Sequence, residues 1–442
     1  MTAAGLPRRA VLAYGALGLP LAFAALPLYV HVPRLYTEAL GLPLAGVGAV
    51  LLAARAVDAV SDPLIGWAND RFGARSGGRG ILLGGLVILA VSLPLLLAPP
   101  AAAGLGWLFA LLVLVSLGYS MASIAYAVWG AEVAPTPALR TRVVASREGF
   151  ALVGVLLAAV LPGVLAGDAG EAAGLAALPW VFIPLLIGGA AWTLGFAPRA
   201  PACPSAATTS LASLPAALRD GDFARLLGVF ALNGIAAAVP SATVLFFVAD
   251  VLRAAELAGL FLALYFLAAA CSLPLWVAAA ARLGKLRAWL AGMALALLVF
   301  AWAGLLGPGD TWAYGLICVL SGFALGADLA LPPSLLADLL ARPGAPQAPR
   351  AASGAAFGWW NFVTKANLAL AAGLALPLLA LLGYSPGSRE AGGVSALAAV
   401  YALVPLVLKL GAMALLWAWR RRLEPSPSFD DAATAALPGA RP

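Results

Sequence analysis

Three charged residues lie three and four positions apart in an otherwise apolar stretch, where Arg55, Asp58 and Asp62 occur within RAVDAVSDP. On an α-helix this spacing places the three side chains on one face. Two carboxylates four residues apart repel each other unless a positive charge lies close to them. Arg55 can pair with Asp58, which leaves Asp62 in need of a cation or a proton.

The neighbours of the two acids offer further oxygen atoms. Ser61 adds a hydroxyl, and Pro63 frees the carbonyl of Ala59 from its helical hydrogen bond. Oxygen ligands of this kind suit Na⁺, and the same carboxylates could instead carry H⁺. The alternative is a structural salt bridge between helices. We favour ion binding because one arginine does not neutralise two acids.

A second deep charge, Lys365, occurs in FGWWNFVTKANLALAAG, with Trp360 and Asn361 about one turn away. We expect a carboxylate of the stretch around Asp58 to be its counter-charge; a lysine that reaches to the membrane surface is the alternative. Trp360 fits packing and solute binding equally well.

Other charges inside apolar stretches are harder to pair. Asp328 is deep, beside two prolines, whereas Asp338 should lie at a helix end in a solvated or capping role. Arg147 could face a cavity, and we expect poor pairing with Glu148 because adjacent residues diverge around a helix. Lys409 has no partner that the sequence indicates.

The composition shows what must position these charges. The chain has 442 residues, is 63% hydrophobic and only 10% charged, and has a mean hydropathy of +0.99; soluble domains average about 25% charged residues. Twelve segments are long enough to span a bilayer. They cover 10–31, 42–68, 80–98, 105–131, 143–166, 177–197, 226–249, 257–281, 288–306, 312–338, 355–383 and 394–418. At 1.5 Å per residue, Asp58 lies about 18 Å from the end of its segment at Asp70, near the bilayer midplane.

The connections divide the chain into two halves. A Pro-, Ala- and Ser-rich stretch at 198–225 separates a bundle over 1–197 from a bundle over 226–418, and 419–442 reads as a disordered tail. With both termini in the cytoplasm, the inner loops hold most of the 26 Lys and Arg residues, whereas the outer loops hold Arg34, Arg253 and Arg389. Membrane topology therefore explains the net charge of +7, and a nucleic-acid partner is not expected.

Motifs for other chemistries are missing. No Gly-rich phosphate loop ends in Lys-Ser or Lys-Thr, and the single histidine, His31, cannot form a His-based metal site. Cys203, Cys271 and Cys318 have neither metal nor redox spacing. We expect no enzyme activity, no cofactor and no metal beyond a possible Na⁺ at Asp58 and Asp62.

Several of these stretches resemble one known family. RAVDAVSDPLIGWANDR followed by GGRG, together with YGALG, GADLALPPSLLAD and FGWWNFVTK, is similar to the glycoside–pentoside–hexuronide:cation symporters, the melibiose-permease-like branch of the major facilitator superfamily. The resemblance implies an all-α polytopic membrane protein with twelve transmembrane helices in two six-helix bundles, the major facilitator fold. It also implies that solute entry is coupled to Na⁺, H⁺ or Li⁺.

The resemblance also assigns residues. Asp58, Asp62, Ser61 and Ser120 match the cation-binding positions, although the family often has Asn where Ser61 stands. The implied solute cavity contains Arg55, Tyr119, Ser123, Trp129, Arg147, Asp328, Trp360, Asn361 and Lys365. Sugar transporters of this family hold sugar hydroxyls with two carboxylates, at positions that match Pro20 and Ser123 here, so simple galactosides should be poor substrates.

We therefore predict a cation-coupled symporter for a small polar solute such as a sugar or glycoside, driven by Na⁺ or H⁺. It should be a multi-pass protein of the cell inner membrane with both termini cytoplasmic. The alternatives are a lipid or amphiphile carrier of the same fold and a non-transporting membrane sensor. The sequence leaves open the solute, the ion, the direction of transport, the oligomeric state and the role of Lys409.

Overall fold

Membrane-length helices account for most of the residues that the structure describes. The computed structural model describes residues 6–73, 78–167, 171–199, 210–342, 353–387 and 390–424, and these ranges contain twelve helical stretches long and apolar enough to cross a membrane. The same ranges contain no strand. The predicted all-α membrane architecture with twelve spans is confirmed.

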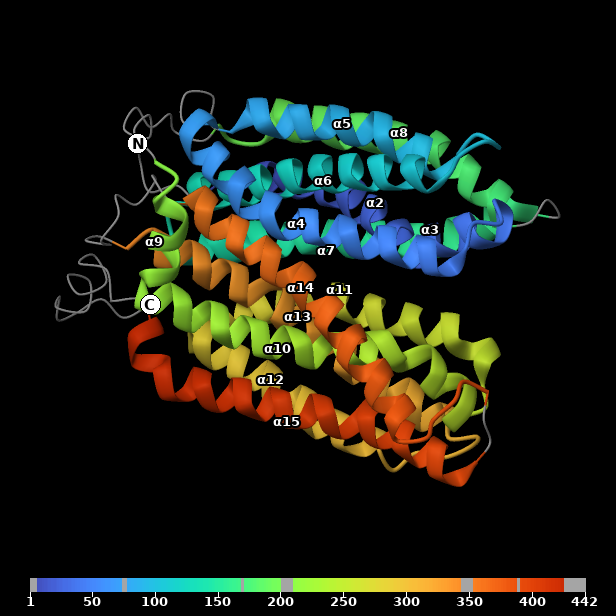
Figure 1. Cartoon of the computed structure of the whole chain (residues 1–442). Helices are drawn as coiled ribbons and strands as arrows, with labels where there is room; N and C mark the ends of the chain where they lie inside the picture. The colour runs from blue at the N-terminus through green and yellow to red at the C-terminus, as the bar shows by residue number, and fades with distance from the viewer. Residues whose placement is uncertain are drawn as a thin grey trace.

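The membrane-length helices run in roughly the same direction across the molecule (Figure 1). The first half contains α1 (Arg8–Gly15), α2 (Gly18–Val30), α3 (Val32–Arg34), the π-helix η1 (Leu35–Ala39), α4 (Leu44–Gly73), α5 (Arg79–Leu97), α6 (Leu105–Val133), α7 (Pro137–Ala166) and α8 (Glu171–Phe196). The second half contains α9 (Ser213–Arg219), α10 (Gly221–Phe246), the π-helix η4 (Phe247–Val251), the 3₁₀ turn η5 (Ala255–Leu257), α11 (Ala258–Leu283), α12 (Lys285–Ala303), α13 (Thr311–Leu340), α14 (Ser353–Leu381) and α15 (Ala391–Leu423).

Helix ends differ from the predicted segments where local capping intervenes. Asp220 accepts hydrogen bonds from the backbone of Asp222 and Phe223 at 2.9 and 3.1 Å, so α10 begins at Gly221 rather than at 226. Within the predicted linker 198–225, residues 200–209 lie outside the described residues, and the short helix α9 follows them. The predicted tail began at 419, but α15 continues to Leu423, and 425–442 lies outside the described residues.

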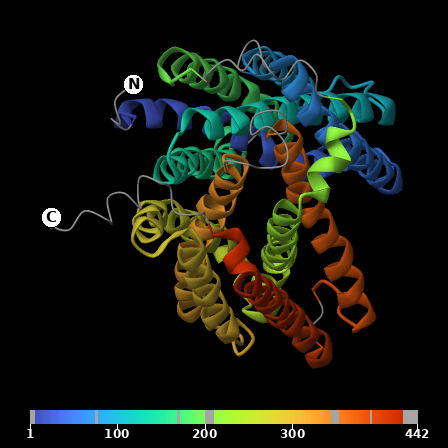
Figure 2. The same ribbon diagram turned by 90° about the vertical axis from the view of Figure 1, so that its left-hand side faces the viewer.

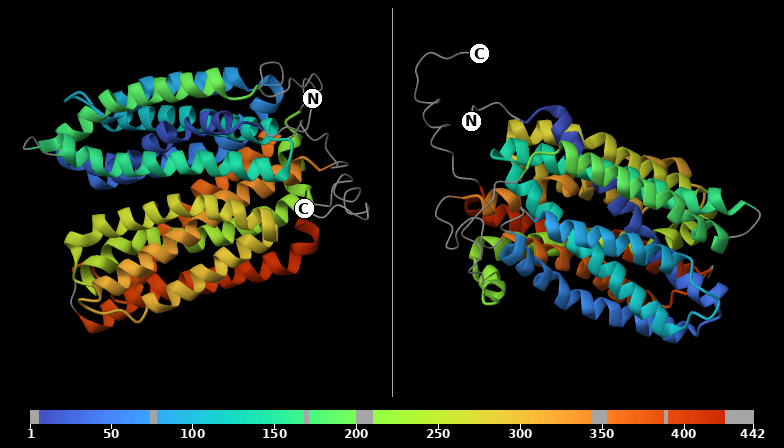
Figure 3. Two further views of the ribbon diagram at one scale, coloured as in Figure 1. Left: turned by 180° about the vertical axis from the view of Figure 1, so that it is seen from behind. Right: turned by 90° about the horizontal axis from the view of Figure 1, so that it is seen from above.

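The transmembrane helices form two bundles, one from α1–α8 and one from α10–α15. Figure 2 shows the two groups from one end, and Figure 3 shows them from behind and from above. A large apolar core lies entirely within the first bundle and a second one within the other. Two further clusters join them: one packs residues of α4 and α6 against α10–α15, and one packs α7 against α11 and α13.

Where α4 meets α14, the backbones of the two bundles come very close. Asp70 of α4 accepts hydrogen bonds from the backbone N–H of Gly354 and Ala355, at 2.6 and 2.9 Å, in the first turn of α14. A carboxylate there satisfies helix donors that have no partner within the helix. Gly66 permits this approach, because a Cβ on it would lie 2.1 Å from the carbonyl oxygen of Gly354.

A second polar contact between the bundles involves Asp338 near the end of α13. Its carboxylate lies 3.1 Å from Arg140 Nη1 of α7 and 2.5 Å from Lys285 Nζ of α12. Only 6% of the Asp338 surface is exposed, so the expected solvated role is wrong. The residue sits at a helix end, as predicted, but the opposite bundle covers it there.

Gly66→Ala should weaken the contact between α4 and α14. The added methyl would overlap backbone atoms, and overpacking of this kind typically costs about 1–3 kcal/mol. We expect a lower melting temperature of the purified protein and slower transport. Gly48→Ala on the same helix is the matched control, since its Cβ would meet nothing within 4 Å. Equal melting curves for the two variants would contradict this packing.

Candidate functional site

The ammonium of Lys365 lies between the two acids singled out in the sequence. Its Nζ is 3.1 Å from Asp58 Oδ1 and 3.0 Å from Asp62 Oδ1. It also donates to Ser120 Oγ at 2.8 Å. Because Lys365 belongs to α14 and the acids belong to α4, this one side chain ties the two bundles together within the membrane.

The remaining carboxylate oxygens also have donors. Arg55 Nη1 lies 3.2 Å from Asp58 Oδ2, and Asn361 Nδ2 donates to Asp62 Oδ2 at 2.8 Å. Asp62 is fully buried and Asp58 is 4% exposed. The group therefore contains two acids and two cations in a place where an unpaired charge would be very costly.

With Lys365 beside them, the two acids are neutralised by two cations and not by Arg55 alone. Arg55 indeed leaves Asp62 without a partner, but Lys365 supplies the missing positive charge. The predicted pairing of Lys365 with this acidic stretch is what the structure shows. Ser61 donates to the backbone oxygen of Asp58 at 3.4 Å, while Ser120 contacts the ammonium directly. That Asp58, Asp62, Ser61 and Ser120 bind a cation stays a prediction.

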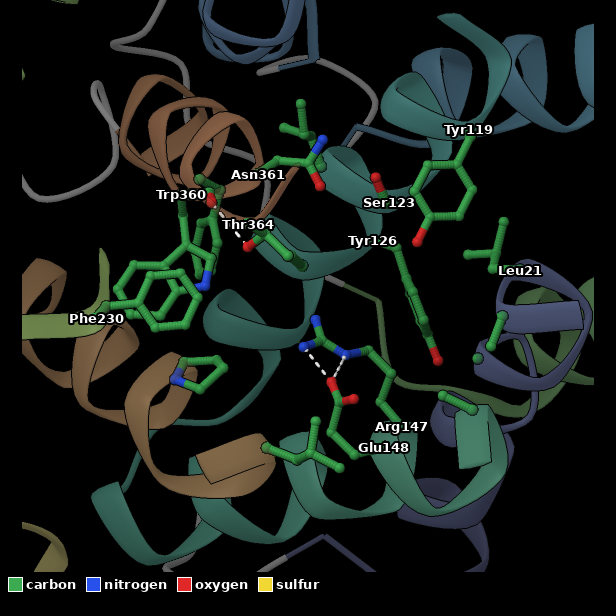
Figure 4. A pocket seen from close by; sticks show the side chains of 18 of the residues that line it. Leu21, Tyr119, Ser123, Tyr126, Arg147, Glu148, Phe230, Trp360, Asn361 and Thr364 are labelled. Carbon is green, nitrogen blue, oxygen red and sulfur yellow. Dashed lines mark hydrogen bonds and ion pairs between the residues drawn. The ribbon is translucent and has the colours of Figure 1, made fainter. Parts of the chain in front are cut away.

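A cavity of about 260 Å³ opens beside this ion-pair group. Its walls come from α2, α6 and α7 of the first bundle and from α10, α13 and α14 of the second. Asn361 lines the cavity and also holds Asp62, so it connects the two regions. Of the predicted cavity residues, the lining includes Tyr119, Ser123, Arg147, Asp328, Trp360 and Asn361, several of which Figure 4 labels.

The cavity combines an aromatic wall with polar side chains. Trp360 stacks on Phe230, with ring centroids 3.8 Å apart and an angle of 18° between the planes (Figure 4). Tyr119, Ser123 and Tyr126 approach from α6. An aromatic face beside hydrogen-bonding groups is typical of sites for small polar molecules with an apolar face.

Arg147 and Glu148 form an ion pair, contrary to the sequence prediction. Nε and Nη2 of Arg147 both donate to Glu148 Oε1, at 2.9 and 2.6 Å (Figure 4). Adjacent side chains leave a helix in different directions, but this rule ignores the length of the arginine side chain. The long arginine side chain reaches its neighbour, and partial burial of both groups in the cavity wall favours their pairing.

Three predicted residues do not line the cavity. Trp129 is 2% exposed in the core of the first bundle, where its indole donates to the Pro198 carbonyl at 2.9 Å, so its cavity assignment is wrong. Arg55 and Lys365 belong to the neighbouring ion-pair group instead. Pro20 packs beside Gly189 of α8; the α2 residues in the cavity wall are Gly18, Leu21 and Ala22.

Lys409 has partners that the sequence did not indicate. Its Nζ lies 2.8 Å from Asp328 Oδ2 and 2.7 Å from Asn233 Oδ1, and Trp289 Nε1 donates to Asp328 Oδ1 at 2.7 Å. Asp328 thus lines the cavity, while its carboxylate accepts hydrogen bonds from the buried side chains of Trp289 and Lys409.

Sequence reasoning also missed other lining residues, among them Tyr126, Glu148, Phe230 and Thr364. Tyr126 could have been found, because Tyr119, Ser123 and Tyr126 recur at helical spacing and therefore share a face. Phe230 and Thr364 carry no such signal, since only helix packing brings them to the cavity. Within the described ranges, no three His, Cys, Asp or Glu residues gather as a metal site.

Comparison with known families decides the class of protein. Residues 11–420 match the sequence model of the family described as MFS/sugar transport protein. The chain belongs to this family. As a major facilitator transporter it has the fold that the resemblance implied. The match does not single out the melibiose-permease-like branch, so the branch stays a prediction.

Solved structures confirm the fold of this transporter at low sequence identity. A bacterial homologue of the iron transporter ferroportin in an outward-facing state is 17% identical, with a TM-score of 0.66 over 94% of this chain and 100% of the other. The E. coli fucose:proton symporter is 13% identical, with a TM-score of 0.69 over 95% and 98%. The human organic anion transporter MFSD10 is 18% identical, with a TM-score of 0.64 over 93% and 100%. A search of curated proteins finds no significant match.

Proposed function

We propose that this transporter is a symporter that couples a small polar solute to a Na⁺ or H⁺ gradient. The observation that carries the proposal is the Lys365 ammonium between Asp58 and Asp62. Two neighbouring carboxylates of this kind can bind a monovalent cation. Here the Lys365 ammonium of the opposite bundle occupies the position between them. An ion that binds these acids must compete with Lys365.

That competition provides a physical basis for coupling. When Na⁺ or H⁺ neutralises one carboxylate, the attraction between α4 and Lys365 of α14 weakens. The two bundles then hold each other less firmly, and alternating access requires their relative movement. Ion occupancy would thus set the strength of a contact between the moving parts.

Asn361 would let the solute take part in the same equilibrium. Its side chain lines the cavity while its Nδ2 donates to Asp62. A solute that draws Asn361 away would remove a hydrogen bond from the acid, and an ion at the acid would replace it. The cavity and the ion-pair group would therefore bind their ligands cooperatively.

The cavity walls favour a sugar-like solute among small polar molecules. Sugar rings present an apolar face that packs on aromatic side chains such as Tyr119, and hydroxyl groups that donate hydrogen bonds to carboxylates such as Glu148 and Asp328. One structural relative is named a fucose:proton symporter, which supports the class and does not identify the solute. The positive charge of the inner loops supports an inner-membrane location with both termini cytoplasmic.

Uptake by purified protein in proteoliposomes tests the proposal. We expect at least one uncharged sugar or polyol to accumulate when an inward Na⁺ or H⁺ gradient is imposed, and to equilibrate without it. Melibiose should not accumulate, because α2 and α6 offer no carboxylate to the cavity.

The other outcomes identify the alternatives. Equal uptake with and without a gradient would contradict coupling. Movement of lysolipids in place of sugars would indicate an amphiphile carrier, and no movement of any tested compound would favour a sensor.

A further inference from the structure

Asp328 lines the cavity while its carboxylate is paired with Lys409. We propose that Asp328 is the solute-binding carboxylate of the second bundle, held in position by Lys409. This inference rests on the proposed function and adds a class of solute: uncharged molecules with adjacent hydroxyl groups. Asp328 and Glu148 are carboxylates in the cavity lining, and they lie on α13 and α7, in opposite bundles.

Side chains from three other helices of the second bundle, α10, α12 and α15, fix the Asp328 carboxylate. Each of its oxygens accepts one buried donor, Trp289 Nε1 at 2.7 Å and Lys409 Nζ at 2.8 Å. Lys409 is anchored in turn by Asn233 Oδ1 at 2.7 Å. Trp289 is fully buried, and Asn233 and Lys409 are 3% and 7% exposed. The carboxylate therefore cannot turn freely.

The fixed carboxylate still has accepting capacity toward the cavity. A carboxylate offers about four lone-pair positions, and the two buried donors use two of them. Two hydroxyl groups on adjacent carbons can donate to the two oxygens at once. Such charge-assisted hydrogen bonds are among the stronger ones, which suits a group that must hold a solute.

Charge balance in the cavity wall disfavours an ionic solute. Asp328 is neutralised by Lys409, and Glu148 by Arg147. A net charge on the solute would then have no partner in the wall, at a considerable cost in free energy. An uncharged molecule with several hydroxyl groups can instead donate hydrogen bonds to these carboxylates without adding a charge.

Binding to the purified full-length protein tests this inference. The probes are glucose, mannose, xylose and mannitol, each measured by thermal shift and by calorimetry beside glucuronate and glucosamine. We expect the uncharged members to bind best. Asp328→Asn should weaken binding of the best probe about tenfold to hundredfold, the effect of losing hydrogen bonds to a charged group.

Lys409 is a positioning residue, and its variants separate position from mere stability. Lys409→Arg should retain most of the affinity, whereas Lys409→Met should lose it. The double variant Asp328→Asn/Lys409→Met leaves no buried charge unpaired and should fold, yet bind as weakly as Asp328→Asn. Asp250→Asn is the control: Asp250 accepts from Tyr384 and Gly387 in the same bundle, outside the cavity lining.

The results that overturn the inference differ from those that overturn the proposed function. Wild-type affinity in a folded Asp328→Asn protein, preferential binding of glucuronate or glucosamine, or no binding of any probe would refute the role of Asp328. Probes that bind with the predicted pattern but never accumulate under an ion gradient would refute symport alone.

Discussion

Asp62→Asn should abolish gradient-driven accumulation of the solute while the protein stays folded. Asparagine keeps the shape of the side chain and can still accept the hydrogen bond that Asn361 donates. Lys365 retains Asp58 at 3.1 Å and Ser120 at 2.8 Å. The group would then carry a net positive charge, which opposes binding of Na⁺ or H⁺.

The measurement compares uptake with and without the ion gradient, beside exchange of labelled solute and a melting curve. We expect exchange to persist, because the cavity lining is unchanged. Asp250→Asn is the matched control and should accumulate solute normally. Asp58→Asn should lose coupling less cleanly, since it also removes the partner of Arg55. A folded Asp62→Asn protein with normal accumulation would leave only a structural role for the acids.

Lys365→Met should destabilise the protein strongly. It leaves two neighbouring buried carboxylates with no ammonium between them, and breaking a buried ion pair typically costs about 3–5 kcal/mol. If Na⁺ is the coupling ion, it can occupy the place of the ammonium among the oxygens of Asp58, Asp62 and Ser120, and its binding would restore part of the lost stability.

Melting curves with and without Na⁺ check this expectation. Lys409→Met is the matched control, because it also removes a buried lysine but leaves the single carboxylate of Asp328. Na⁺ should raise the melting temperature of Lys365→Met more than that of Lys409→Met. If Lys365→Met is destabilised and Na⁺ does not raise its melting temperature, the result would favour H⁺ as the coupling ion. Wild-type stability of Lys365→Met would contradict the role of the bridge.

Local sequence patterns were sufficient to predict much of this transporter. Long apolar runs predicted the twelve spans, because each span must satisfy its own backbone hydrogen bonds in lipid and so appears as an uninterrupted segment. Helical spacing placed Arg55, Asp58 and Asp62 on one face. The high cost of an unpaired charge in the membrane predicted that Lys365 would find one of these acids, although 303 residues separate it from Asp62.

Other features depend on how the helices are rotated and packed. Trp129 and Trp360 are both tryptophans in apolar helices, yet one turns into a core and the other into the cavity. The pairing of Arg147 with Glu148 depends on the reach of a long side chain in a buried wall, and that of Lys409 with Asp328 depends on the approach of α15 to α13. The sequence by itself determined which segments had to lie in the membrane and that charges within them needed partners. Only the tertiary structure decided those partners, because pairing depends on distances between helices that no local pattern encodes.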